Sequence, residues 1–222
     1  MEFPDGVKII GRVRICLESV KNLKLKSKVL VDIGSSFGWL EKEIVNADLK
    51  KIVGIEPNDK ALRFAKTNIP SVDFRKGSAL KTDLPDSFSD IVILFDVIEH
   101  VPKFSEMKVL HEVGRIIKKE GALLLSTPNN HFLNNILDPG WYFGHRHYSI
   151  RKITDLLKKS GFKVERFEIK GKIFAPIYML WFYVNKWLLG GCFNNIRWLD
   201  KKYDLSYQGP GFHTIFIEAK RI

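Results

Sequence analysis

The chain has 222 residues, of which 45% are hydrophobic, 12% aromatic and 27% charged, a composition that excludes disordered, collagen-like and coiled-coil proteins. Its two cysteines, Cys16 and Cys192, are too few for a disulfide framework or a cysteine-based zinc cluster, and they fit a reducing compartment. The N-terminus lacks the apolar core of a signal peptide, so we expect a cytoplasmic protein.

The formal net charge of +11 is distributed unevenly along the chain. Residues 31–144 carry 14 basic and 16 acidic side chains, whereas residues 145–222 carry 15 and 6. We therefore expect an acidic or amphiphilic partner to meet the C-terminal third, the alternative being a solvated face of scattered lysines.

Short β-rich apolar runs alternate with amphipathic stretches, which is typical of βα units around a parallel sheet. An opening helix is predicted over residues 7–20. Strands are expected over residues 28–33, 51–56, 72–75, 90–95, 122–126, 163–169 and 214–220, and further helices over 37–46, 59–68, 104–118 and 150–160. The sequence thus predicts an α/β fold with a doubly wound, seven-stranded sheet.

No linker rich in Pro, Gly or Ser divides the chain, so we expect residues 1–222 to form one domain. The predicted parts are an N-terminal helix region (1–27), a core (28–170), an insertion (171–212) and a final strand (213–222).

Two long connections interrupt the alternation, an aromatic loop at residues 129–148 and the insertion before the last strand. Within the insertion, residues 173–189 are the most apolar stretch, with Pro176 suited to the first turn of a helix and Gly190 and Gly191 to its end. The stretch is too short to span a bilayer. It is interpreted either as a helical lid buried over the active site or as an element in peripheral contact with an anionic membrane.

The strongest local motif is a buried strand that runs through Asp32 into a turn with Gly34 and Gly38 and then opens a helix. Glycines allow a ligand to approach the backbone, and the helix N-terminus offers free amides. A dinucleotide fingerprint would read G-x-G-x-x-G without a charge at the strand end. Asp32 would repel a pyrophosphate and favour a cationic ligand; the alternative is an ordinary Asp-Gly turn.

Acidic residues also end two later strands. Glu56, followed by Pro57, stands where a doubly wound sheet holds a ribose diol, although a surface Glu at a strand end is the alternative. The strand over residues 90–95 ends at Phe95 and Asp96 and is followed by Glu99 and His100.

Four segments in this order, DIGSSFG, VGIEP, FDVIEHV and GRIIKKEGALLLSTPN, resemble the class I S-adenosylmethionine-dependent methyltransferases, and in particular the small-molecule and quinone-biosynthesis subgroup. The resemblance covers about residues 28–170. It implies S-adenosylmethionine as the cofactor and a last strand that runs antiparallel between the fifth and sixth.

The resemblance also implies a set of cofactor-binding residues, namely Asp32, Gly34, Ser35, Ser36, Gly38, Glu56, Pro57, Ser78, Ala79, Phe95 and Asp96. Two positions depart from the usual pattern. Ser36 replaces the middle glycine of the turn, and Ser78 replaces the acidic residue that commonly meets the adenine amino group.

Methyl transfer is an in-line displacement that depends mainly on positioning donor and acceptor, with a general base where the acceptor loses a proton. His100 is the candidate base, and bracing the following helix is its structural alternative. Candidate acceptor-binding residues are Trp141, His145, Arg146, His147 and Tyr148, which could equally anchor the next helix. No trio of ligands at metal-binding spacing is apparent, so no metal is expected.

The sequence therefore predicts an enzyme that methylates a small-molecule acceptor, with a lipid-linked or glycan-type acceptor as the finer alternative. A nucleic-acid methyltransferase is the first rival, favoured by the net charge of +11 but lacking the expected motifs after the fourth strand. A nicotinamide-dependent oxidoreductase is opposed by the glycine spacing. A non-catalytic, membrane-associated module that binds the cofactor is the third alternative.

Overall fold

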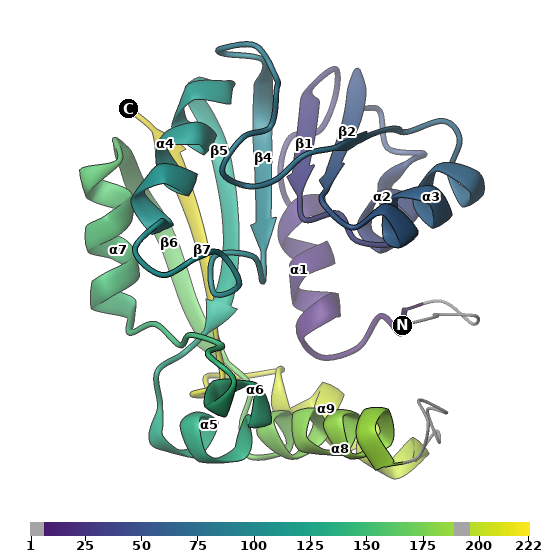
Figure 1. Ribbon diagram of the computed structural model, residues 1–222, viewed down its shortest axis with the longest axis vertical. Coiled ribbons are helices and arrows are strands. Elements are labelled where there is room, and N and C mark those ends of the chain that lie inside the picture. The colour runs from purple at the N-terminus through teal and green to yellow at the C-terminus, as the bar shows by residue number, and fades with distance from the viewer. Residues whose placement is uncertain (1–6, 189–195) are drawn as a thin grey trace.

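The computed structural model describes residues 7–188 and 196–222, and within them a seven-stranded sheet forms the centre of the molecule (Figure 1). The strands are β1 (Val29–Ile33), β2 (Lys51–Glu56), β3 (Asp73–Lys76), β4 (Ser89–Phe95), β5 (Ile117–Pro128), β6 (Phe162–Lys170) and β7 (Thr214–Arg221). Their order is β3-β2-β1-β4-β5-β7-β6, and only β7 is antiparallel, to both neighbours. The predicted doubly wound sheet and the place of its last strand are confirmed.

Helices cover both faces of the sheet because the buried side chains of each strand point alternately to the two faces. On one face, α1 (Arg12–Lys21), α2 (Trp39–Ile44) and α3 (Asp59–Asn68) share a core with strand residues such as Leu30 and Ile93. On the other, α4 (Glu106–Ile116) and α7 (Ile150–Lys159) pack with residues such as Val31 and Leu94. Ser149 caps α7 by accepting a hydrogen bond from the Lys152 N–H.

Some boundaries differ from the predicted ones for local reasons. The first helix begins at Arg12, not at residue 7, because Gly11 has a φ of 55° and breaks the helical path. The fourth predicted helix ends at Ile116, because Ile117 already pairs with Ser89 in the sheet and starts β5.

Four further helices lie beyond the carboxyl ends of β4 and β5, and we call them the cap (Figure 1). The cap consists of α5 (Phe132–Leu137), α6 (Pro139–Tyr142), α8 (Phe174–Leu188) and α9 (Arg197–Ser206). The expected aromatic loop thus contains two short helices, the second capped by Asp138, which accepts the N–H of Gly140. The expected apolar helix is α8, whereas α9 was not predicted. The predicted helix stop at Gly190 and Gly191 lies outside the described residues.

Hydrogen bonds and an ion pair join the start of α1 to α9 and so link the cap to the rest of the fold. Asp204 Oδ1 accepts hydrogen bonds from the Gly11 N–H at 2.7 Å and from Arg14 Nε at 2.9 Å. Lys8 pairs with Asp200 in the same region. None of the helices within residues 7–188 and 196–222 is long and apolar enough to cross a membrane.

Candidate active site

The turn after β1 has the backbone geometry that its glycines suggest. Gly34 and Gly38 have φ angles of 85° and 78°, and Ser36 between them has a φ of 51°. A Cβ at Gly34 would lie 2.5 Å from Val97 Cγ2, so a larger residue would collide with the loop after β4. Ser36 occupies the left-handed region that glycine would adopt more easily, so the departure from the usual pattern is accommodated at a cost in backbone strain.

Glu56 connects this turn to the end of β2. Its Oε2 accepts the backbone N–H of Ser36, and its Oε1 accepts that of Asn58, both at 2.8 Å. The side chain is 8% exposed. A carboxylate oxygen can accept more than one hydrogen bond, so a ligand with two hydroxyl groups fits this position.

Asp32, at the end of β1, lies beside a second buried acid, Glu41 of α2. Burial raises the pKa of Asp32 to about 7, with the Glu56 charge adding to the shift and a hydrogen bond from Glu41 opposing it. Burial and the charge of Asp32 raise the pKa of Glu41 well above its usual range, so Glu41 keeps the proton of the pair. An ionised Asp32 would attract an ammonium group. The sequence analysis did not identify Glu41, because an acid on a short helix gives no sign of being buried.

The other expected cofactor residues lie at or near the same edge of the sheet, as the parallel register of β3, β2, β1 and β4 requires. Ser35 is buried in the glycine turn, and the exposed Pro57 follows Glu56. Ser78 and the buried Ala79 form the loop after β3, close to β2 through the hydrogen bond from the Gly77 N–H to Glu56 O.

Phe95 ends β4, and the next residue, Asp96, is held in a strained backbone conformation with a φ of 53°. Its Oδ1 accepts a hydrogen bond from Ser126 Oγ at 2.9 Å, and its Oδ2 pairs with Arg12 Nε at 3.1 Å. The N-terminal helix therefore contributes a guanidinium to this site, which the sequence did not indicate.

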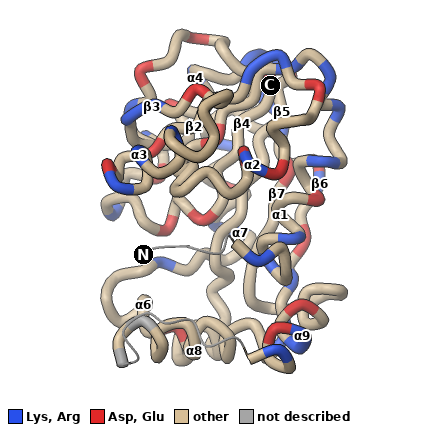
Figure 2. The backbone as a smooth tube through the Cα atoms, turned by 90° about the vertical axis from the view of Figure 1, so that its right-hand side faces the viewer, with Lys and Arg blue, Asp and Glu red and all other residues tan. Residues whose placement is uncertain are grey.

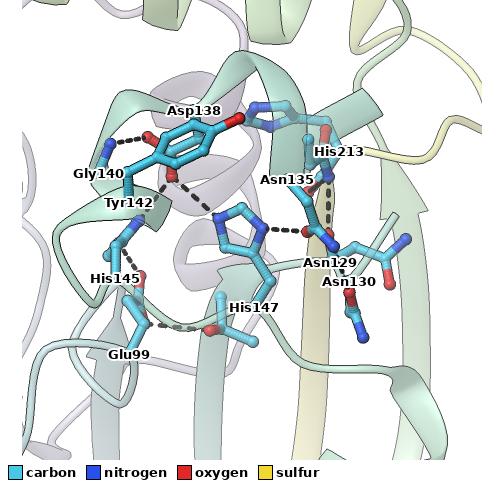
Figure 3. A network of polar contacts seen from close by, with 12 residues as sticks. Glu99, Asn129, Asn130, Asn135, Asp138, Gly140, Tyr142, His145, His147 and His213 are labelled. Atoms are coloured by element: carbon cyan, nitrogen blue, oxygen red, sulfur yellow. Dashed lines mark hydrogen bonds and ion pairs between the residues drawn. The ribbon is translucent and has the colours of Figure 1, made fainter. Parts of the chain in front are cut away.

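A network of polar side chains is centred on Asp138, which joins α5 to α6 in the cap (Figure 3). Asp138 Oδ2 accepts hydrogen bonds from His145 Nδ1 at 2.7 Å and from His147 Nε2 at 2.9 Å, and Oδ1 accepts the Gly140 N–H. Burial acts to raise the pKa of Asp138, but the two histidines hold it well below its usual range. His147 Nδ1 is also 2.8 Å from Asn135 Oδ1, so both histidines are fixed in orientation.

Glu99 and His100, which follow β4, face this network. Glu99 is 2% exposed; its Oε2 accepts a hydrogen bond from Thr127 Oγ1 at 3.0 Å, and its Oε1 is 4.0 Å from His145 Nε2. The His100 ring stacks on that of His145 with centroids 4.7 Å apart. Desolvation and His145 lower the pKa of His100, although part of the ring reaches solvent.

Arg146 and Tyr148 brace the loop that carries Glu99 and His100. Arg146 Nη2 donates to the carbonyl oxygens of Ile98 at 2.8 Å and Val101 at 2.6 Å. The buried Tyr148 hydroxyl donates to Ile98 O at 3.2 Å and to Glu106 Oε1 at 3.0 Å. Trp141 is 37% exposed and its ring lies 4.8 Å from that of His147. Of the predicted acceptor-binding residues, Trp141, His145 and His147 therefore place their rings at the network. Arg146 and Tyr148 instead hold the loop after β4 in place.

Residues 31–125 match the family described as a methyltransferase domain. A probable S-adenosylmethionine-dependent methyltransferase of Mycolicibacterium smegmatis is 30% identical over 117 residues, which is 52% of this chain and 45% of that protein. The chain thus spans about half the length of the curated relatives it matches.

Solved structures share the fold at low sequence identity. An S-adenosylmethionine-dependent methyltransferase from Mesorhizobium loti superposes with a TM-score of 0.66 at 15% identity, over 93% of this chain and 96% of that one. The [4+2]-cyclase SpnF gives 0.69 at 15% identity, over 94% and 80%. Because one of these neighbours is named as a cyclase, the likeness in fold does not fix the reaction.

The match to a methyltransferase domain over residues 31–125 includes the end of β1, the glycine turn, Glu56 and β4. The curated relatives that match about half of this chain are named as probable S-adenosylmethionine-dependent methyltransferases, so S-adenosylmethionine is the cofactor that these matches indicate. The carboxyl groups of Glu56 and Asp32 can accept hydrogen bonds from hydroxyl and ammonium groups, both of which that cofactor carries.

Proposed function

We propose that the chain transfers a methyl group from S-adenosylmethionine to a small-molecule acceptor bound between the sheet edge and the cap. The position of the His100 and His145 rings supports this proposal most directly. They stand just beyond Asp96, at the end of the strand that lies next to β1 and its glycine turn.

The cofactor supplies an electrophilic methyl group, whose bond to sulfur breaks as the bond to the acceptor atom forms, leaving the electron pair on sulfur. The protein contributes chiefly by holding the partners in line and by limiting water. Asp32 and Glu56 position the amino-acid and ribose ends of the cofactor. His100 receives the proton that the acceptor loses, or orients the acceptor.

A lipid-linked acceptor is supported by the distribution of apolar side chains over the cap. Ten of the fifteen exposed large hydrophobic side chains among the described residues belong to the cap and its connecting segments. They are Phe132, Ile136, Trp141, Tyr142, Phe143, Ile173, Leu180, Trp187, Trp198 and Leu205. Aromatic residues of this kind favour the interface of a bilayer.

The charges of the cap agree with contact to an anionic surface. Helix α8 is almost free of charged residues in its described part, whereas α9 carries three basic residues, Arg197, Lys201 and Lys202 (Figure 2). Its two acidic residues, Asp200 and Asp204, are paired with Lys8 and Arg14. Basic groups near an anionic bilayer contribute about 1 kcal/mol each. We propose that the cap faces the membrane and receives the acceptor there.

The acceptor is found by incubating the protein with radiolabelled S-adenosylmethionine and fractions of a cell extract. The expected result is label in one extract fraction, extractable into organic solvent, that is absent with a His100→Ala variant. Label in protein or nucleic acid alone would contradict the small-molecule proposal, and no label in any fraction would contradict methyl transfer.

Membrane contact is tested separately by cosedimentation with vesicles of neutral or anionic lipid at low and high salt. The parent should sediment with anionic vesicles at low salt, and a double variant with Trp187→Glu and Trp198→Glu should not. Phe104→Glu is the matched control, because Phe104 is 94% exposed and lies outside the cap. A parent that stays in the supernatant would contradict the membrane proposal and leave the cap as a lid.

A further inference from the structure

Three side chains that can ligate metals converge just beyond the end of β4. Glu99 and His100 follow that strand, and His145 comes from the segment after α6 (Figure 3 shows Glu99 and His145). Each offers a ligand atom, and these atoms lie within 4.8 Å of one another. About forty-five residues separate His145 from the other two, so the spacing in the sequence conceals the trio.

One oxygen of Glu99 is buried without a hydrogen-bond partner. Oε2 accepts from Thr127, but Oε1 has no partner among the described residues, and the side chain is 2% exposed. A buried carboxylate oxygen in this state is costly unless a positive group meets it. His145 Nε2 lies 4.0 Å from this oxygen, which leaves room for an ion between the two atoms.

The orientation of His145 is the one expected of a metal ligand. Its Nδ1 is bound to Asp138 Oδ2 at 2.7 Å, so in the neutral ring Nε2 carries the free electron pair and faces Glu99. Histidines that ligate metals usually donate their other ring N–H to a carboxylate in this way.

A second trio, Asp138, His145 and His147, is also close enough to hold an ion. Its contacts are already satisfied, however, because Asp138 Oδ2 lies 2.7 Å and 2.9 Å from the two ring nitrogens and Oδ1 accepts the Gly140 N–H. This trio therefore orients the histidines, and the unpaired oxygen of Glu99 distinguishes the first one.

We propose that Glu99, His100 and His145 bind a divalent transition-metal ion. Two imidazoles and one carboxylate suit Zn²⁺ or Mn²⁺ better than Mg²⁺. In a tetrahedral site with bonds of about 2.1 Å the ligand atoms lie about 3.4 Å apart, so small side-chain rotations complete the site.

The coordination positions that the three side chains leave open on the ion are the ones that could take part in the reaction. His100 is exposed, so further coordination positions face solvent and the cap. Resting on the proposed function, the ion would hold an oxygen atom of the acceptor there and so select acceptors with a hydroxyl or carboxylate group next to the methylated position. His100 then orients the acceptor through the ion, because an imidazole bound to a metal cannot also accept a proton.

The test is a calorimetric titration of chelator-treated protein with Zn²⁺, Mn²⁺ and Mg²⁺, without cofactor or acceptor. We expect one Zn²⁺ or Mn²⁺ per chain and much weaker Mg²⁺ binding. Glu99→Gln and His145→Ala should each weaken binding by about a hundredfold or more. The matched control His111→Ala removes an exposed histidine of α4 outside the trio and should bind as the parent does.

Because His100 is exposed, the His100→Ala variant is expected to fold as the parent does. It should weaken metal binding without lowering the melting temperature. The proposal is overturned if the parent takes up no stoichiometric ion, or if Glu99→Gln and His100→Ala bind as tightly as the parent. Cofactor titration in parallel separates the two claims: intact metal binding without S-adenosylmethionine binding contradicts the proposed function alone, and the reverse contradicts the metal site alone.

Discussion

The backbone N–H of Ser36 donates a hydrogen bond of 2.8 Å to Glu56 Oε2, and this contact joins the glycine turn after β1 to the end of β2. The other oxygen, Oε1, accepts the N–H of Asn58. The carboxylate is therefore oriented by the backbone of two neighbouring βα connections. A site oriented in advance loses less entropy when its ligand binds.

The stability of the free protein should depend on Asp32 in a defined pH range. The folded pKa is about 7 and the ordinary value 3.8, so the folded state holds a proton that the unfolded state releases. Its contribution to stability is complete below about pH 4 and is lost as the pH rises through 7. Urea denaturation between pH 4 and 8 should show this loss in the parent and not in Asp32→Asn.

Asp155→Asn is the control for that series, because Asp155 is an exposed carboxylate of α7. It should reproduce the pH dependence of the parent. An identical pH dependence of Asp32→Asn and the parent would show that folding does not raise the pKa of Asp32.

Glu41 should tolerate glutamine but not alanine. A protonated carboxyl and an amide have the same shape, and both can donate a hydrogen bond to Asp32. We expect Glu41→Gln to unfold at or above the melting temperature of the parent at pH 8. Glu41→Ala should lose about 1 to 3 kcal/mol, because it leaves a cavity and an unpaired buried acid. Strong destabilisation by glutamine would mean that Glu41 is ionised.

Replacing Arg146 with lysine should loosen the loop that carries Glu99 and His100. A lysine ammonium lacks the planar fork with which Arg146 reaches the carbonyl oxygens of Ile98 and Val101. We expect a lower melting temperature and slower methyl transfer, with S-adenosylmethionine affinity within about threefold of the parent, since less than 1 kcal/mol is lost there. Arg151→Lys, on the exposed side of α7, is the control and should change neither quantity.

His100→Ala should reduce turnover and leave cofactor affinity within about threefold, a difference of less than 1 kcal/mol. The reason is position: His100 stacks on His145 beyond β4, whereas the glycine turn and Glu56 lie at the ends of β1 and β2. Single-turnover assays with a labelled cofactor measure the first quantity and calorimetry the second. Equal turnover in parent and variant would return His100 to a structural role.

The seven strands could be located from the sequence because most of them are short apolar runs beside a turn signal. Periodicity located β1, β2 and β4, and the resemblance placed β7. The helix α9 was missed because its polar residues give no apolar stripe; Leu199 and Ser206 are its buried residues. The short α5 and α6 are held by single caps, which act over too few residues to produce a periodic pattern.

The candidate site was predicted where a motif is continuous and missed where it is assembled from distant segments. The residues around the glycine turn and Glu56 are of the first kind. Arg12, Glu41 and Asp138 are of the second, since their contacts with Asp96, Asp32 and His145 exist only after folding. Asp138 precedes Pro139 and Gly140, so the sequence indicates a helix cap there but not a partner for two histidines.

The proposed methyl transfer depends first on binding of S-adenosylmethionine through Glu56, and calorimetric titration with that cofactor tests this binding directly. The parent should bind one molecule per chain. Glu56→Ala should bind about tenfold to a hundredfold more weakly, because a hydrogen bond to a charged group contributes about 1.5 to 3 kcal/mol. Glu43→Ala, which removes an exposed acid of α2, should bind as the parent does. Equal affinity of Glu56→Ala and the parent, or binding of a nicotinamide dinucleotide in place of S-adenosylmethionine, would contradict the account.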